Sequence, residues 1–152
     1  MRIKSNLLFA IFLLFLTGCG YESIYSSKGL KFSINNFNLI GDKNLGRYFE
    51  ERIKRFRGSN QNSFNINLNI NKTKNIVSKD KKGDPSIYGL GISVKVDFLK
   101  GDKLYNSTLF TQSINYNNKD DKFELSRYEK NLEKQLIDKI IEDFLLYAQR
   151  IQ

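Results

Sequence analysis

The chain has 152 residues with a formal net charge of +9, one cysteine and no histidine. This length favours a single domain, and a hydrophobic content of 40% is enough to form a core, which disfavours an intrinsically disordered chain. A single cysteine excludes a disulfide framework within the chain, and there is no cysteine and histidine cluster to bind zinc. Without histidine the chain lacks the commonest general base and the Ser-His and Cys-His nucleophile pairs, so much enzyme chemistry is excluded. We expect no cofactor and no metal site.

Residues 1–19 have the features of an export signal. Arg2 and Lys4 provide a positively charged start, and every residue from Leu7 to Leu16 is apolar. A helix needs about twenty apolar residues to span a bilayer, so this run is too short to be a membrane span. A charged start, a short apolar run and small residues after it are typical of a secretory signal.

The end of this signal, Leu16-Thr17-Gly18-Cys19, resembles the bacterial lipobox. The resemblance implies that Cys19 receives a diacylglycerol thioether, that the chain is cleaved before it, and that the new amine is acylated. It predicts a signal peptide over residues 1–18, a lipidated tether over 19–30 and a single domain over 31–152. Gly20 rather than an aspartate follows the cysteine, which by the same resemblance permits export to the outer membrane, on its periplasmic side. The alternative is a short buried helix with a chance cysteine.

The first part of the domain predicts a strand followed by a helix. Residues 31–40 have a period of two that changes phase before Phe37. A turn follows over residues 41–44, where Asn44 is expected to cap the helix. The helix is predicted to end at Gly58, and it has apolar residues at helical spacing: Leu45, Tyr48, Phe49, Ile53 and Phe56.

The central part predicts a meander of three strands. Residues 64–71 alternate between apolar residues and asparagine without fault, so one face of this strand is apolar and the other is polar. A polar linker over residues 79–84 leads to a strand over 88–98, and a turn over 100–103 joins it to a strand over 104–116. In this last strand we expect Leu104 to share a face with Phe110, with Tyr105 on the other face.

The C-terminal part predicts a long helix that begins after Asp121 and runs to about Ile151. The element order is therefore β-α-β-β-β-α, in which the first crossover makes strands one and two parallel. The predicted fold is an α/β (α+β) two-layer sandwich with a four-stranded mixed sheet and two helices on one face.

In this fold the second face of the sheet has no helix over it. The simpler interpretation of its polar residues is a solvated surface, and the alternative is a surface that meets a polar, water-filled wall. The two glycines on it could form a trench for another backbone or an acyl chain, or mark a bulge or a sharp twist. The candidate contact residues on this face are Asn65, Asn67, Asn69, Gly89 and Gly91.

Two compact basic groups lie near predicted strand ends. Lysine can act as a point charge on phosphate, whereas charged loops are usually only solvated. No phosphate-cradling loop and no basic sheet interleaved with aromatic residues is present, so we expect no nucleic-acid partner. The candidate phosphate-binding residues are Lys79, Lys81, Lys82, Lys100 and Lys103.

The segment from Leu16 to Tyr25 resembles the start of the lipopolysaccharide-assembly lipoproteins, the LptE family. Gly20, Tyr21, Ile24 and Tyr25 fit the family pattern, while Ser23 stands where proline is usual. The order of predicted elements also agrees along the whole mature chain. The resemblance rests on this segment, on the element order and on Tyr116-Asn117 before the last helix.

The resemblance implies a lipoprotein without enzyme activity that plugs the β-barrel of the outer-membrane lipopolysaccharide translocon, an LptD-type partner. It further implies that the protein helps assemble that barrel and binds lipopolysaccharide, with the candidate lysines on lipid A phosphates and the polar sheet face against the barrel wall. The alternative is an adaptor or pilot lipoprotein of another envelope secretion machine.

Overall fold

The computed structural model describes residues 33–58 and 63–151, so the predicted signal peptide and tether, Cys19 included, lie outside the described residues. The described elements are β1 (Ser33–Gly41), α2 (Lys43–Ile53), the short 3-10 helix η1 (Lys54–Phe56), β2 (Ser63–Lys79), β3 (Pro85–Lys100), β4 (Lys103–Asn117) and α3 (Lys122–Arg150). Their order confirms the predicted β-α-β-β-β-α pattern.

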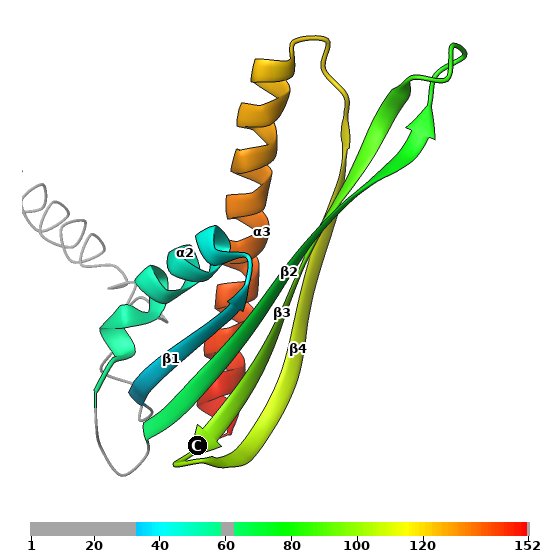
Figure 1. Cartoon of the computed structure of the whole chain (residues 1–152). Helices are drawn as coiled ribbons and strands as arrows, with labels where there is room; N and C mark the ends of the chain where they lie inside the picture. The colour runs from blue at the N-terminus through cyan, green and yellow to red at the C-terminus, as the bar shows by residue number, and fades with distance from the viewer. Residues whose placement is uncertain (1–32, 59–62, 152) are drawn as a thin grey trace, which may run out of the picture.

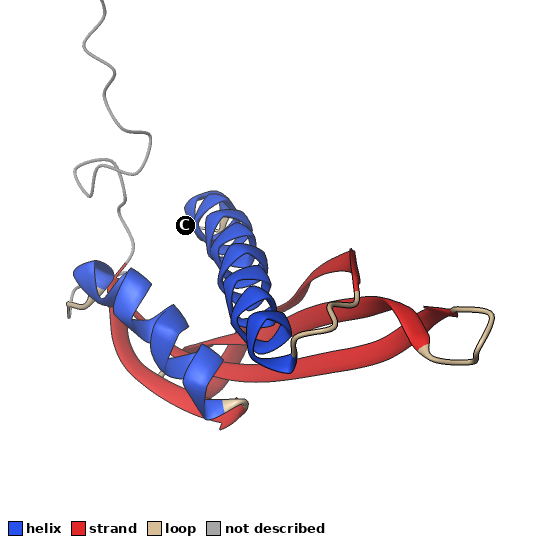
Figure 2. Ribbon diagram, turned by 90° about the horizontal axis from the view of Figure 1, so that it is seen from above, coloured by secondary structure: helices blue, strands red, loops and turns tan. Residues whose placement is uncertain are grey.

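The strands form one four-stranded sheet in the order β1-β2-β3-β4. β1 pairs parallel with β2, and the β2–β3 and β3–β4 pairs are antiparallel. Both helices lie on the same face of the sheet (Figures 1 and 2), which confirms the predicted two-layer α+β architecture.

A bulge explains the change of phase in the first strand. The register between β1 and β2 shifts between Ile34 and Asn36. The extra residue returns Phe37 and Leu39 to the helix side, where both pack against the core that buries Ile34.

The first helix begins earlier than predicted. Asp42, not Asn44, is its N-cap, because the Asp42 carboxylate accepts hydrogen bonds from the backbone N–H groups of Asn44 and Leu45. The α-helix ends at Ile53 rather than at Gly58, and η1 then brings Phe56 into the core. The carboxylate of Asp42, at the N-terminus of α2, also suits the positive end of the helix dipole.

The alternating segment is the start of a much longer strand. Phe64, Ile66, Leu68 and Ile70 are buried, as the alternation predicts. β2 does not end at Asn71 but continues to Lys79. The sequence predicted no strand for this added segment. The β2–β3 hairpin therefore projects past the N-terminal part of α3 (Figure 1).

A second bulge corrects the prediction for the last strand. Phe98 pairs with Asn106 and Leu99 with Leu104, so that Tyr105 is the extra residue. Leu104 therefore shares the open face with Leu99, and the prediction that it lies with Phe110 is wrong. Tyr105 turns instead to the helix side, where its ring lies 5.3 Å from that of Phe64 and its hydroxyl donates to the Ile151 carbonyl.

The core lies between the sheet and α3. Phe144 of α3 contacts the rings of Phe49 from α2 and of Phe98 and Phe110 from the sheet, with centroid distances of 5.3, 5.8 and 6.4 Å. α3 begins, as predicted, with Asp121 as its N-cap. Within the described residues no helix combines the length and the apolar character that a membrane crossing requires.

Gly41 is required at the end of β1. Its φ is 89°, and a Cβ there would lie 2.1 Å from the carbonyl oxygen of Ile70. We expect Gly41→Ala to lower the free energy of unfolding by about 2 kcal/mol, because backbone and not a flexible side chain blocks the methyl group. Urea unfolding followed by circular dichroism measures this loss.

Gly83→Ala is the matched control for that substitution. Gly83 also has a positive φ, of 91°, but no atom lies within 4 Å of the added methyl group. Gly83→Ala therefore measures the cost of the backbone strain without a steric clash. An equal loss of unfolding free energy in both variants would contradict the proposed clash at Gly41.

Candidate binding surfaces

The structure brings the predicted contact residues together on the sheet face without helices. Asn65, Asn67 and Asn69 alternate with buried residues of β2, whereas Gly89 and Gly91 lie on either side of the buried Leu90 of β3 and Gly89 is itself buried. Asn65 is already hydrogen-bonded, since it accepts from Asn35 and donates to the Gly101 carbonyl. The result is one open polar face, with its asparagines towards one end and its glycines towards the other.

The two glycines do not form an open trench. A Cβ on Gly89 would lie 2.8 Å from Oδ1 of Asn75 and 3.2 Å from Oδ1 of Asn115. A Cβ on Gly91 would lie 2.8 Å from Oγ1 of Thr73. Side chains of the neighbouring strands therefore occupy the space above both glycines, which accounts for glycine there without an inserted ligand.

The two basic groups do not form one site. Lys79, Lys81 and Lys82 lie at the β2–β3 tip, next to the start of β3, whereas Lys100 and Lys103 flank the turn at its other end. A strand of this length separates its ends by about 50 Å. Lys100 also packs its ammonium 4.3 Å from the ring centroid of Tyr105 and 5.3 Å from that of Phe64.

The β2–β3 tip is an ordered turn built around Asp80. The Asp80 carboxylate accepts hydrogen bonds from the backbone N–H groups of Lys82 and Asp84. A hollow of about 680 Å³ beside the tip is lined by Asp80, Lys82, Asp84, Pro85, Ser86, Tyr88, Asn118, Asp120 and Lys122. Because carboxylates and ammonium groups share this lining, the hollow is of mixed charge.

Two lysines that the sequence analysis did not select connect the hairpin to α3. Lys74 Nζ donates to Glu129 Oε1 at 2.6 Å, and the Tyr116 hydroxyl donates to the same oxygen at 2.7 Å. Lys72 Nζ donates to Glu133 at 3.0 Å and also lies 3.6 Å from Asp42. The sequence feature that could have identified them is the alternation in β2, because both lysines are in phase with its apolar residues.

This network shifts the pKa values of its carboxyl groups. Burial raises the pKa of Glu129, but hydrogen bonds from Lys74 and Tyr116 and the charges of Lys74 and Lys72 outweigh burial and hold that pKa below its usual value. Burial likewise raises the pKa of Asp42, while the N–H of Leu45 and the charge of Lys72 bring it below its usual value. Burial and the hydrogen bond to Glu129 raise the pKa of Tyr116 far above its ordinary value.

The network predicts a loss of stability in acid. A carboxyl group with a lowered pKa binds fewer protons folded than unfolded, so its contribution is complete above the unfolded pKa and lost as the pH falls through the folded one. For Glu129 and Asp42 the ordinary values are 4.5 and 3.8, so we expect the free energy of unfolding to fall from about pH 5 downwards. Glu129→Gln should make this fall shallower and should cost about 1–3 kcal/mol at pH 7. Urea titrations at pH 3.5, 5 and 7 measure both effects.

Glu124→Gln on the same helix is the matched control. The Glu124 side chain is 62% exposed and lies 3.7 Å from Lys119, so its replacement should change little. A Glu129→Gln variant with the same pH dependence as the unmodified chain would contradict the role of Glu129.

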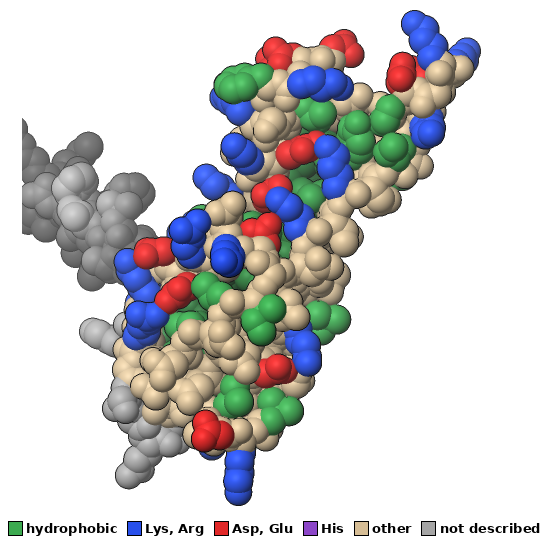
Figure 3. Space-filling view, viewed as in Figure 1, with side chains coloured by type: hydrophobic (Ala, Val, Ile, Leu, Met, Phe, Trp, Pro, Cys, Tyr) green, Lys and Arg blue, Asp and Glu red, His purple; other side chains and the backbone are tan. Residues whose placement is uncertain are grey.

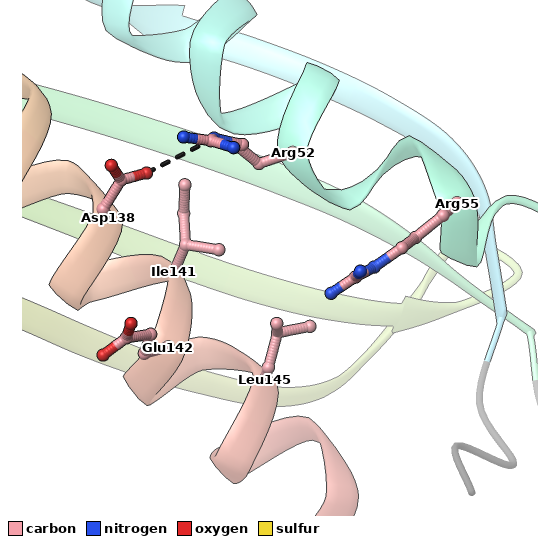
Figure 4. A pocket seen from close by; sticks show the side chains of 6 residues that line it. All are labelled: Arg52, Arg55, Asp138, Ile141, Glu142 and Leu145. Carbon is pink, nitrogen blue, oxygen red and sulfur yellow. Dashed lines mark ion pairs between the residues drawn. The ribbon is translucent and has the colours of Figure 1, made fainter. Parts of the chain in front are cut away.

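A shallow pocket of about 310 Å³ lies between α2, η1 and α3 (Figure 4). Arg52 points across it towards Asp138, with 3.4 Å between Nε and Oδ1, and also donates to the Tyr48 hydroxyl. That hydrogen bond, followed by the charge of Asp138, raises the pKa of Arg52. Arg55 stacks over Phe56. The pocket is thus a partly paired, mixed-charge surface, and Figure 3 shows the same interspersion of charges over the helices.

Among residues 33–58 and 63–151 no group of three or more acidic residues is arranged to hold a metal ion. The surfaces described above are the open polar sheet face, the basic β2–β3 tip and the helix side of the domain.

No protein-family model matches the chain, and no curated protein matches it. Several solved structures match in fold, among them the following two. A minor lipoprotein from Acinetobacter baumannii matches with a TM-score of 0.62 and 12% identity, over 80% of this chain and 93% of that one. An uncharacterized lipoprotein B from Nitrosomonas europaea matches with a TM-score of 0.61 and 14% identity, over 86% of this chain and 91% of that one. At these identities the likeness concerns the fold, and the chain has the architecture of these bacterial lipoprotein structures.

Proposed function

We propose that the chain is an outer-membrane lipoprotein that plugs and helps assemble the β-barrel of the lipopolysaccharide translocon and binds lipopolysaccharide. It is anchored on the periplasmic side through a diacylglycerol and an N-acyl chain on Cys19. The observation that carries this proposal is the lipoprotein fold, which extends over most of a chain whose N-terminal segment resembles both the lipobox and the LptE family.

The shape of the domain supports a plug. One layer of helices covers one face of the sheet, and the other face presents asparagine side chains in rows on β1 and β2. Asn36 pairs with Asn65 and Asn38 with Asn67 in the β1–β2 register, so these rows are adjacent. Amides can both donate and accept hydrogen bonds, which suits contact with a hydrated barrel wall.

The projecting hairpin supports the binding of a phosphorylated lipid. Its tip places Lys79, Lys81 and Lys82 beyond the N-terminal part of α3 (Figure 1). On the helix side of the hairpin, Ile76 and Tyr88 form a cross-strand pair and Ile76 is half exposed. Positive charge next to exposed apolar surface suits a ligand that has both phosphates and acyl chains.

Site-specific photo-crosslinking in cells tests the plug. A photoreactive residue at Asn67 should crosslink to a large β-barrel protein if the open face meets the wall. The matched control is Glu51, whose side chain is 68% exposed on α2, on the helix side of the sheet. Recovery of a different envelope protein from Asn67 would favour the adaptor or pilot alternative, and recovery of no protein would contradict the wall contact.

Measurement of lipopolysaccharide binding shows which of the two basic groups forms the binding site. Replacing Lys79, Lys81 and Lys82 together by glutamine should weaken binding of purified lipopolysaccharide by about tenfold or more, since each exposed phosphate contact contributes modestly. The control is the double replacement of Lys100 and Lys103, at the opposite end of β3. Equal weakening by both variants would show a general charge effect rather than a site at the tip.

A further inference from the structure

Beyond its bulge at Tyr105, the outer edge of β4 has little of the protection that sheet edges normally have. β4 is the last strand of the sheet, and in the described part of the chain it pairs only with β3. From Leu104 to Asn117 it contains no charged residue and no proline. Natural edge strands are usually short, charged, bulged along their length or covered, because an open edge is a template for another strand.

The other edge of the same sheet shows such protection. β1 has nine residues, against fifteen in β4, and each of the two strands has one bulge near its start. Arg57 also forms a parallel bridge with Ile34, and the N–H of Gly58 donates to the Ile34 carbonyl. The contrast indicates that the long, uncharged edge of β4 is a pairing surface.

The surface beside this edge has apolar and charged groups in a regular arrangement. Leu109 of β4 is 63% exposed, and Leu146 of α3 is 40% exposed. The two belong to one hollow of about 360 Å³, which is also lined by Phe110, Thr111, Asp143, Tyr147 and Arg150. Asp143 and Arg150 thus stand one turn to either side of Leu146 and Tyr147 on α3, with opposite charges.

We propose that β4 pairs antiparallel with β4 of a second copy of this chain, about a two-fold axis that passes near Leu109. Such an axis places one half of β4 opposite the other half of β4 in the second copy. A charged residue near the axis would therefore lie close to the same residue of the other copy and repel it. Here Thr108 comes opposite Phe110, Ser107 comes opposite Thr111, and Leu109 meets Leu109 of the other copy. The uncharged sequence makes this self-pairing possible.

The helices fit the same axis. Phe144 of α3 contacts Phe98 of β3 and Phe110 of β4, so α3 lies over the boundary between these two strands. With a strand spacing of about 4.8 Å, the two copies of α3 come about 10 Å apart, a distance at which helices pack. The proposed axis makes the two copies of α3 antiparallel, and Leu146 lines the same hollow as Leu109, so that Asp143 of each copy comes opposite Arg150 of the other. The surface is therefore complementary to itself in charge as well as in strand pairing.

Disulfide formation tests the pairing in the full mature chain, purified in detergent. Opposite residues in an antiparallel pair have Cα atoms about 4.5–5.5 Å apart, which suits a disulfide. Leu109→Cys should therefore give a covalent dimer under mild oxidation. The unmodified chain accounts for any reaction of Cys19, and Ile40→Cys, 52% exposed on the β1 edge, is the matched control. Crosslinking of Leu109→Cys no greater than that of Ile40→Cys, or crosslinking only to a different protein, would overturn the proposal.

Charge reversal tests the helix contact independently. Asp143→Arg should raise the dissociation constant of the dimer, measured by sedimentation, by about tenfold, because it places a positive charge opposite Arg150 at each of the two symmetry-related contacts. The double variant Asp143→Arg/Arg150→Asp should restore the original value, which a general loss of folding could not do. A chain that sediments as a monomer at about 100 μM, or a double variant as weak as the single one, would overturn the proposal. Since neither assay involves a barrel or lipopolysaccharide, these outcomes are independent of the proposed function.

Discussion

Cys19→Ser is expected to release the protein from the membrane fraction almost completely. Burial of an acyl chain contributes about 0.8 kcal/mol per CH₂, so one chain binds a membrane marginally while three chains hold a protein there firmly. A serine hydroxyl cannot form the thioether, and without it the signal would not be processed as in a lipoprotein. Fractionation of cells into soluble and membrane parts, followed by immunoblotting, measures the release.

Mass spectrometry of the purified protein tests the same prediction, because the lipid anchor is covalent and adds mass to the chain. The unmodified protein should begin at Cys19 and have the added mass of its acyl chains. Ser27→Ala, a replacement in the predicted tether, is the matched control and should remain in the membrane fraction. A native protein that begins at Met1, or a Cys19→Ser variant that stays in the membrane fraction, would contradict the lipid anchor and with it the proposed localisation.

Phe144→Ala is expected to lower the free energy of unfolding by about 3–5 kcal/mol, the typical cost of removing a fully buried aromatic ring. Phe144 has no exposed surface and joins both layers, with Phe98 stacked against it at 5.8 Å and Phe49 edge-on at 5.3 Å. A domain of this size is stable by only about 5–15 kcal/mol, so this one substitution removes a large share. Urea unfolding followed by circular dichroism measures the loss.

Phe123→Ala is the matched control in the first turn of the same helix. Phe123 is 71% exposed, so its loss should change the free energy of unfolding by no more than about 0.5 kcal/mol. Phe144→Leu should fall between the two because it keeps part of the buried volume. A loss below about 1 kcal/mol for Phe144→Ala would contradict the role of this ring in joining α2, α3 and the sheet.

The open polar face and the β4 edge depend on this core in the same way. Both are presented by the sheet, and the rings around Phe144 pack the sheet against one helix layer. A substitution that loosens the core would therefore weaken both surfaces together. Substitutions at Asn67 or at Leu109, which lie on the surface, should weaken them separately.

The sequence alone determined the type and order of the elements. The alternation from Phe64 to Ile70 and the helical stripe from Leu125 to Ala148 predict a strand and a helix because each period reflects local backbone geometry. The crossover rule then implies that β1 and β2 are parallel, which the structure confirms. Asp121 could also be identified as a cap, since capping is a local interaction.

Only the tertiary structure decided the details that depend on a neighbouring strand or helix. The bulge at Tyr105 exists because β4 must match the register of β3, and it moved Leu104 to the open face. On the helix side, Lys72 and Lys74 pair with Glu133 and Glu129 of α3, across more than fifty residues of chain. The separation of the two basic groups and the open edge of β4 have the same origin. Strand length, register and edge exposure are properties of the assembled sheet, and no single segment of the chain specifies them.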